Sequence, residues 1–267
     1  MGTQAAEVAI FGGTGFYSFL DDPTEVSVST PYGNPSDRVT LGAVNGKRVA
    51  FLPRHGRDHT IPPHEVNYAA NLWAMRDLGV ERVFGPCAVG SLDPAVRPGD
   101  IVVCDQFIDR TWGRRSTYYD GPVTTHISLA DPYCPELREL TIKTATALEL
   151  PVHETGTTVV VQGPRFSTRA ESRAYAATGG TVINMTGCPE AALARELELC
   201  YVNISLVTDY DAGLADDGKS GPVTHVEVRE VLKSNQEKVR TLLLASLSAL
   251  PATRTCGCSS ALAAARM

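Results

Sequence analysis

The stretch YVNISLVTDYDAG, residues 201–213, decides how this chain folds and where its chemistry lies. Its first seven residues are apolar and rich in β-branched side chains, which predicts a buried strand over 201–207. The strand ends in Asp209 and Asp211, and Gly213 follows as a chain breaker. Side chains at i and i+2 of an extended segment point to the same face, so one ligand could contact both carboxylates.

Two carboxylates this close raise each other's pKa, so one of the pair can hold a proton near neutral pH. A carboxylic acid beside a carboxylate offers a donor and an acceptor, which matches a ring nitrogen next to an exocyclic amine, as on the N7/N6 edge of adenine. Two solvated loop aspartates are the alternative interpretation, and an isolated D-x-D motif favours it. The rest of the chain has to decide between the two.

The bulk properties exclude several classes of protein. The chain has 267 residues and a net charge of −6, with no run of basic residues. This length suits one large domain, and the charge gives no indication of nucleic acid or an anionic membrane as a partner. No apolar stretch approaches the roughly 20 residues of a membrane span, and the start, MGTQAAE, lacks a signal pattern. We therefore expect a cytoplasmic protein.

Seven cysteines are scattered along the chain. Most lie in apolar, strand-like contexts, which predicts small buried side chains in a reducing compartment. Cys256 and Cys258 differ, because two thiols one residue apart could bind a metal or oxidise. This C-x-C motif has no second pair of ligands beside it in the sequence, so we expect no metal site there.

Strands alternate with helices along the chain, which indicates an α/β domain. Asn45-Gly46 favours a two-residue hairpin turn between strands predicted at 39–41 and 48–52. The other predicted strands are 8–11, 83–90, 100–107, 157–161, 181–185 and 201–207, and the predicted helices are 67–78, 135–150, 169–177, one beginning at Pro189, and 226–250. We expect residues 108–133 to form a functional loop or a subunit contact, and the tail from Pro251 to be peripheral and frayed.

Glycines follow the first predicted strand, in the sequence GGTG at 12–15. Glycine lets backbone N–H groups approach an anion closely, and Thr14 adds a hydroxyl donor. A tight structural turn explains the motif equally well. A dinucleotide site is not favoured, because the G-x-G-x-x-G pattern fails at its last position, Ser18.

A cationic cluster follows the strand at 48–52, where two arginines and three histidines fall within eleven residues. Such a cluster costs electrostatic energy unless an anion or a carboxylate neutralises it. Because Arg54 and His55 lie at the strand end, we expect them to hold an oxyanion. Arg57 and His64 are expected in an exposed, solvated loop.

Eight motifs occur in the same order as in the purine nucleoside phosphorylase family, and the chain resembles its methylthioadenosine phosphorylase branch. These motifs are GGTG (12–15), PRHGRDH (53–59), VNYAANLWA (66–74), AVGSL (88–92), DQFIDRT (105–111), QGPRFSTRAES (162–172), INMTG (183–187) and TDYD (208–211). The resemblance implies one α/β domain over 1–267, with its core at about 8–250 and a central mixed, partly barrel-like β-sheet flanked by helices. It also implies a homotrimer with active sites near the subunit boundaries.

The resemblance further implies phosphorolysis of a nucleoside to a free base and a sugar 1-phosphate, with inorganic phosphate as co-substrate and no metal or organic cofactor. The phosphate site resembles the set Thr14, Arg54, His55, Cys87, Ala88 and Thr186. Asp209 and Asp211 resemble the catalytic pair that reads the base. The substrate-binding set resembles Phe166 as an aromatic wall, Ser167 as support for the aspartates, Met185 at the ribose, and His225, Val228 and a neighbouring subunit's His126 near the 5′ group.

The implied chemistry agrees with the residue types. Breaking the N-glycosidic bond builds positive charge on the ribose and negative charge on the base, so the site needs a phosphate nucleophile and an acid at N7. Arg54 and His55 would hold the phosphate, whose charge also stabilises the oxocarbenium-like state. Protonated Asp209 would serve N7 while Asp211 accepts from the 6-amino group; which of the two holds the proton is a property of the pair.

Two positions depart from the family pattern. Cys87 stands where a threonine hydroxyl commonly contacts phosphate, and a thiol is a poor donor. His225 stands where methylthioadenosine phosphorylases are apolar and where relatives that act on ordinary nucleosides use a histidine for the 5′-hydroxyl; an exposed residue at the helix start is its alternative interpretation. Val228 keeps apolar character nearby. Adenosine or another 5′-substituted adenosine is therefore an alternative substrate.

Three other functions compete with this prediction. A 6-oxopurine phosphorylase needs a donor to O6, and Asp211 argues against it. A nucleoside-binding protein without catalysis would keep the aspartates and Phe166 but would have no need for the cations Arg54 and His55. A dehydrogenase would depend only on the defective glycine motif.

Overall fold

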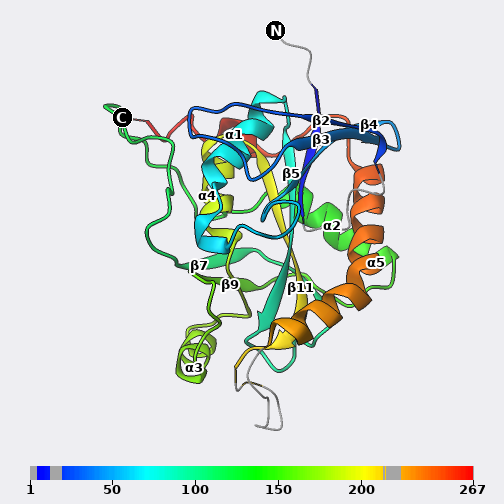
Figure 1. Ribbon diagram of the computed structural model, residues 1–267, viewed down its shortest axis with the longest axis vertical. Coiled ribbons are helices and arrows are strands. Elements are labelled where there is room, and N and C mark those ends of the chain that lie inside the picture. Colours follow the sequence, from blue (N-terminus) through cyan, green and yellow to red (C-terminus); the bar gives the residue numbers. More distant parts are fainter. Residues whose placement is uncertain (1–4, 13–19, 213, 215–223, 267) are drawn as a thin grey trace.

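Strand β5 (Arg82–Ser91) joins the two arms of the β-sheet in the computed structural model, which describes residues 5–12, 20–212, 214 and 224–266. β5 pairs in parallel with β1 (Val8–Gly12) and with β11 (Cys200–Tyr210), and antiparallel with β10 (Val182–Asn184). β1 pairs with the beginning of β5 and β10 with its end, whereas β11 runs along its other edge. Figure 1 shows β5 and β11 as the long central pair.

The sheet continues outward from this centre in both directions. One arm has the order β2-β3-β4-β1-β5-β10-β9-β7, and the other runs from β11 through β6 to β8. The remaining strands are β2 (Asp21–Val26), β3 (Val39–Val44), β4 (Lys47–Pro53), β6 (Ile101–Val103), β7 (Gln106–Arg110), β8 (Val152–His153) and β9 (Thr157–Val161). Parallel and antiparallel pairs both occur, so the predicted α/β fold with a central mixed sheet is confirmed.

The described residues form five α-helices: α1 (Tyr68–Asp77), α2 (Pro135–Ala147), α3 (Arg169–Ala177), α4 (Gly187–Glu196) and α5 (His225–Ala249). Alternation along β1 shows how the two faces are buried. Ala9 and Phe11 belong to the core that contains α1 and α4 residues, whereas Val8 and Ile10 belong to the core that contains α2 and α5 residues. The helices accordingly lie on both sides of the central strands in Figure 1.

Local sequence signals explain several element ends. Asn45 and Gly46 both have positive φ (50° and 78°), as a tight hairpin turn requires, and they join β3 to β4. The Asn67 side chain accepts from Ala70 N and caps α1. Thr168 caps α3, with Glu171 completing a capping box.

The strand predicted over 100–107 is wrong, because the chain forms β6 and β7 instead. Between them Asp105 accepts a hydrogen bond from Gly156 N through Oδ1 (2.8 Å) and donates its own N–H to Gly156 O (3.2 Å). The chain thereby changes partners, since β6 pairs with β11 and β7 pairs with β9. Strands β2 and β8 were not predicted: β2 is polar and mostly exposed, and β8 has two residues.

The tail after Pro251 is ordered against the body of the protein, so the prediction of a frayed tail is wrong. Cys258 and Ala265 are buried. Leu262 N donates to Glu198 Oε1 (3.2 Å), and Ala265 O accepts from His126 N (2.8 Å). Among the helices of the described residues, none combines the length and apolar character that crossing a bilayer requires.

Candidate active site

A buried arginine lies where β1 and β4 end side by side. Gly12 and Pro53 are partners in the register, and Arg54 follows directly. Arg54 is 4% exposed; its Nε and Nη2 donate to Glu190 (2.7 and 2.8 Å), and its Nη1 donates to Pro86 O (3.2 Å). Burial alone would lower the pKa of Arg54, but the charge of Glu190 and the hydrogen bonds to it raise that pKa overall. These contacts use three of the five guanidinium N–H groups, which leaves two for an anion.

Glu190 was not singled out by the sequence analysis. It is fully buried in α4, and its Oε1 also accepts from Tyr201 OH (2.6 Å). A single carboxylate inside the apolar run CPEAALA is the signal that could have found it, because such a group needs a buried cation. Glu190 fixes the orientation of the Arg54 guanidinium.

His55 is neutral in this environment. Burial, followed by the nearby Arg54 charge, lowers the pKa of His55 to about 4. Its Nδ1 lies 2.9 Å from Ile61 O, and a carbonyl only accepts, so Nδ1 carries the proton and Nε2 is left to interact with a ligand. An anion at Nε2 would favour the charged imidazolium and raise this pKa again.

Cys87 follows Pro86, whose carbonyl accepts from Arg54, and both Cys87 and Thr186 contact Asn184. Asn184 Nδ2 donates to Cys87 Sγ (3.4 Å), and Asn184 Oδ1 accepts from Thr186 N (3.3 Å). Cys87 Sγ also accepts from Asn203 Nδ2 (3.4 Å). Thr186 precedes α4, and its hydroxyl does not cap that helix. Thr186 therefore offers a hydroxyl just before α4, the helix that carries Glu190, and a helix N-terminus suits an anion.

Asp209 and Asp211 meet at a second place on β5. A Cβ atom built on Gly90 would lie 3.1 Å from Asp209 Oδ1 and 3.3 Å from Asp211 Cβ, so only glycine admits both side chains here. The register shifts between Val207 and Asp209, which makes Thr208 the extra residue of a β-bulge. Thr208 Oγ1 lies 2.7 Å from Asp209 Oδ2. The bulge turns the end of β11 so that both aspartates reach Gly90.

Asp211 is the more deeply buried aspartate, at 3% exposure. Burial raises the pKa of Asp211, although the hydrogen bond from Ser172 Oγ (2.6 Å) opposes the rise. Ser167 was predicted to support the aspartates, whereas the side chain that contacts Asp211 is Ser172. Ser172 lies one turn after the Thr168 cap, so the same capped helix places it.

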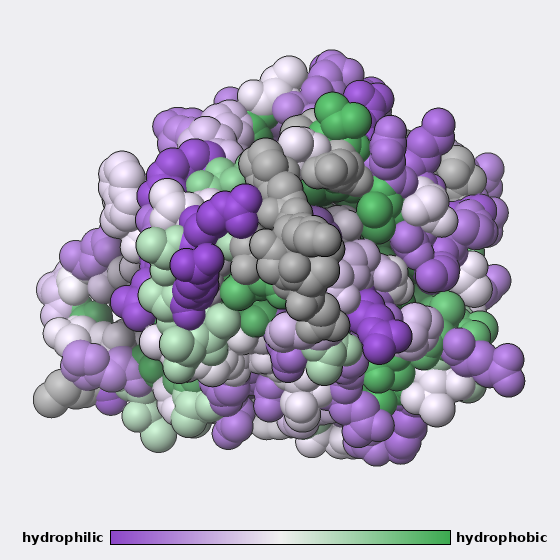
Figure 2. All heavy atoms as spheres, turned by 90° about the horizontal axis from the view of Figure 1, so that it is seen from below, coloured by the Kyte–Doolittle hydropathy of each residue, from purple (hydrophilic) through white to green (hydrophobic). Residues whose placement is uncertain are grey.

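The surroundings of Arg54 and the aspartate pair lie at different positions along β5. From Cys87 to Gly90 the chain advances three residues, about 10 Å at the usual rise of a strand. A ligand that joins an anion at Arg54 to a heterocycle at Asp209 therefore has to extend along β5. Both strands end toward the lower part of Figure 1, and on the face seen from below in Figure 2 hydrophilic and hydrophobic residues are interspersed.

Met185 and Phe166 come from the ends of β10 and β9. A Cβ built on Gly163 would lie 2.6 Å from Met185 Sδ, so this sulfur packs closely on the segment that leads to Phe166. Phe166 itself is 39% exposed. Ala88, also predicted at the site, is partly buried in β5 and pairs with Leu206.

Arg114 holds these two segments together and was missed by the sequence analysis. Its Nη1 donates to Met185 O (2.9 Å) and Cys188 O (2.8 Å), and its Nη2 donates to Gln162 O (2.7 Å). The irregular segment around Arg114 has no periodicity that would have indicated this role. The Arg114 guanidinium thus provides hydrogen-bond donors for backbone carbonyl groups that follow β9 and β10.

Some predicted residues stay untested in this chain. His126 is exposed and Val228 is partly buried in α5. Thr14 lies outside the described residues, and so does the side chain of His225, whose backbone begins α5. Ser167 is partly exposed ahead of α3.

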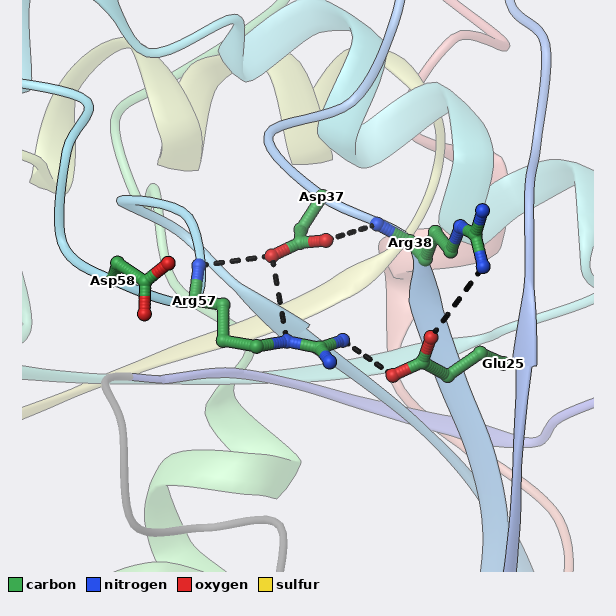
Figure 3. A pocket seen from close by; sticks show the side chains of 5 residues that line it. All are labelled: Glu25, Asp37, Arg38, Arg57 and Asp58. Carbon is green, nitrogen blue, oxygen red and sulfur yellow. Dashed lines mark hydrogen bonds and ion pairs between the residues drawn. The ribbon is translucent and has the colours of Figure 1, made fainter.

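The pocket in Figure 3 is a different place. It is lined by Glu25, Asp37, Arg38, Arg57 and Asp58. Arg57 forms ion pairs with Glu25 and with Asp37, and Arg38 lies 3.8 Å from Glu25. Its two cations are thus already neutralised by acids, in agreement with the expectation that Arg57 belongs to a solvated surface.

The chain is similar to known proteins over nearly its whole length. The family model described as the phosphorylase superfamily matches residues 7–248. A purine nucleoside phosphorylase of Streptomyces coelicolor is 55% identical, with 96% of this chain and 94% of the relative covered. A methylthioadenosine phosphorylase of Pyrococcus furiosus is 52% identical, with 96% and 97% covered. A solved variant of the adenosine/methylthioadenosine phosphorylase of Schistosoma mansoni in complex with adenine has a TM-score of 0.91, 36% identity, and coverage of 98% and 99%.

Proposed function

The chain belongs to the phosphorylase superfamily, and from this membership we propose that it catalyses the phosphorolysis of 5′-methylthioadenosine to adenine and 5-methylthioribose 1-phosphate. The enzyme is a pentosyltransferase, as the names of its relatives indicate. The observation that carries the proposal is the pair of charged groups along β5, a buried cation bonded to Pro86 O and two aspartates at Gly90.

The reaction follows from these two charged groups. A phosphate oxygen forms a bond to C1′ of the ribose while the bond from C1′ to N9 breaks, and the electron pair of that bond passes to the purine. A carboxylic acid of the Asp209/Asp211 pair gives its proton to N7, so the base departs without a full negative charge. The phosphate lies beside the positive charge that develops on the ribose and stabilises it.

The phosphate is held by Arg54, His55, Thr186 and Thr14, with Cys87 and the backbone at Ala88 beside it. The two remaining N–H groups of Arg54 and the Nε2 atom of His55 support this assignment. Asp209 serves N7, and Asp211 accepts from the 6-amino group with Ser172 and Ser167 beside it. Burial raises the pKa of Asp211, and which of the two carboxyl groups holds the proton is a property of the pair.

The sugar lies against Met185, and Phe166 forms the wall at the base or ribose. His225, Val228 and His126 of a neighbouring subunit lie near the 5′ group. This arrangement belongs to a homotrimer, with residues 1–267 as one domain in each subunit. The enzyme acts in the cytoplasm on small molecules alone, with inorganic phosphate as co-substrate and without a metal or organic cofactor in the reaction.

The runner-up is a broader phosphorylase that accepts adenosine or other purine nucleosides, as the Streptomyces coelicolor relative's name suggests. The test is purine release from methylthioadenosine, adenosine and inosine, each with and without phosphate, compared as kcat/KM. Methylthioadenosine should win by orders of magnitude, and only with phosphate present. Equal values for adenosine would favour the broader enzyme, and turnover without phosphate would contradict phosphorolysis.

His225→Val provides the matching variant test. Removing a hydrogen-bonding imidazole near the 5′ position should shift relative kcat/KM toward methylthioadenosine. An unchanged ratio would place His225 outside the pocket.

A further inference from the structure

Four cysteine thiols from distant parts of the chain converge on one point of the structure. The Sγ atoms of Cys134, Cys200, Cys256 and Cys258 all lie within 4.8 Å of one another. Cys200 Sγ and Cys256 Sγ are 3.3 Å apart. In a tetrahedral zinc site with Zn–S bonds of about 2.3 Å, neighbouring sulfurs are about 3.8 Å apart. This value lies between the 3.3 Å separation and the 4.8 Å limit for the whole group, so small side-chain adjustments would complete the tetrahedron.

The four thiols come from three segments of the fold. Cys134 caps α2, Cys200 begins β11, and Cys256 and Cys258 flank Gly257 in the tail. Three of them are buried and Cys256 is half-buried, so the site is closed in the manner of structural zinc sites. A Cβ on Gly257 would meet nothing within 4 Å, which leaves the short C-x-C turn free to adjust.

Positive groups lie next to the four sulfur atoms. Arg195 Nη1 lies 3.6 Å from Cys258 Sγ, and Arg254 Nη1 lies 4.0 Å from Cys200 Sγ. Leu137 N, in the first turn of α2, lies 3.5 Å from Cys134 Sγ. Four thiolates around Zn²⁺ carry a net charge of −2, and two arginines with a helix N-terminus offset it.

We propose that Cys134, Cys200, Cys256 and Cys258 bind one zinc ion, which fixes the C-terminal tail to α2 and β11. The proposal replaces the expectation drawn from the isolated C-x-C motif. The second ligand pair is Cys134 and Cys200, which the fold supplies from positions 122 and 56 residues before Cys256. The site has no open coordination position for a substrate, so its role is structural.

Other contacts show what the ion would stabilise. Thr255 donates to Glu136 Oε2 through its N (2.7 Å) and Oγ1 (2.9 Å), which places the tail on α2 just before Cys256. Beyond Cys258 the tail reaches the irregular segment, where Thr125 and Arg266 form a β-bridge and His126 N donates to Ala265 O. The zinc ion therefore also holds the backbone at His126 in place.

The experiment measures metal in the full-length protein, purified under reducing conditions without chelator. Elemental analysis and native mass spectrometry should find one zinc per chain. Replacement by Co²⁺ should give the strong thiolate-to-metal absorption and the visible bands of a tetrahedral site. Zinc removal by a chelator with a mercurial should lower Tm by several degrees, and zinc addition after reduction should restore it.

Cys256→Ser and Cys258→Ser are the informative variants, because both change the tail rather than the sheet. Zinc content should fall well below one per chain in each. Cys104→Ser is the matched control: it removes another buried thiol, outside the cluster, and should keep one zinc. If the tail variants do not fold, the zinc content and cobalt spectrum of the unchanged chain decide the question. Absence of zinc, or a mass that shows disulfides among these four residues in the freshly purified protein, would overturn the proposal.

Discussion

Arg54 and Glu190 form a two-bonded ion pair, at 2.7 and 2.8 Å, in which both side chains are almost completely buried. The carboxylate holds the guanidinium in one orientation before any anion arrives. Binding a phosphate there does not require a long side chain to become ordered, so less of the binding energy is lost. Tyr201 OH in turn fixes Glu190, so the anion site rests on a helix and two strands.

Glu190→Gln tests this pair. The variant leaves the buried Arg54 charge without its counter-charge, which should lower the free energy of unfolding by about 3 kcal/mol. KM for phosphate should rise by about tenfold, since the guanidinium loses its fixed orientation. Urea denaturation and phosphate saturation curves measure the two effects. Glu139→Gln, which removes an exposed ion pair with Lys143, is the control and should change stability by about 0.5 kcal/mol or less. A normal KM for phosphate would show that Glu190 serves stability alone.

Asp209→Asn tests the acid. An amide cannot transfer a proton to N7, so kcat for methylthioadenosine should fall by about 10²- to 10³-fold while Tm changes little. Asp58→Asn, on the exposed surface of Figure 3, is a matched change of charge that should leave kcat intact. Full activity of Asp209→Asn would assign proton transfer to another group.

Gly90→Ala tests the close approach on β5. The added methyl group would meet Asp209 Oδ1 at 3.1 Å, Ile183 Cγ2 at 3.2 Å and Asp211 Cβ at 3.3 Å, so the aspartates have to move. We expect kcat/KM to fall by at least about tenfold, because positioning of catalytic groups is sensitive to shifts of this size. Gly121→Ala, where a methyl group meets nothing within 4 Å, is the control. Equal activity of the two variants would mean that the aspartates adapt without loss.

The pH dependence of stability tests His55. Its pKa is about 4 in the folded protein and about 6.5 in the unfolded chain, so the unfolded state binds more protons between these values. The contribution of the neutral ring is complete above pH 6.5 and is lost as the pH falls toward 4. This contribution to the free energy of unfolding should be about 2 kcal/mol, a value reduced because the His55 ring is partly exposed to solvent.

The measurement compares Tm of the unchanged chain and of His55→Asn from pH 7.5 to 4.5. The advantage of the unchanged chain should shrink as the pH falls, and added phosphate should oppose this loss because it favours the imidazolium. A difference in Tm that is constant over this range would contradict the lowered pKa.

The fold was predictable where one periodicity extends over many residues. β5, β11 and the main helices follow from apolar patterns, and the hairpin at Asn45-Gly46 follows from turn chemistry. The division of residues 100–107 into β6 and β7 was not predictable. The chain changes its pairing partner at Asp105 because of a contact with Gly156, which is distant in the sequence. β2 was not predicted because its residues are polar, and only its pairing with β3 makes it a strand.

The site was predictable only in part, because sequence shows a functional group more readily than the group that positions it. Arg54, His55 and the aspartates stood out as charges at strand ends. Glu190, Arg114 and the four-cysteine cluster act through partners that only the fold brings near, and no spacing in the sequence encodes those encounters.

Both parts of the proposed site contact β5, Arg54 at Pro86 and the aspartates at Gly90, which limits how the proposed enzyme can acquire new substrates. β5 pairs with β11 from Arg82 to Ser91, so an insertion between Cys87 and Gly90 would shift this register, and the spacing between the proposed phosphate and base sites is therefore constrained. Diversification has to occur at the sugar's 5′ end, where loops and neighbouring chains can change without disturbing the sheet. A library that aims to alter selectivity should therefore vary His126, His225 and Val228 and leave residues 82–91 untouched.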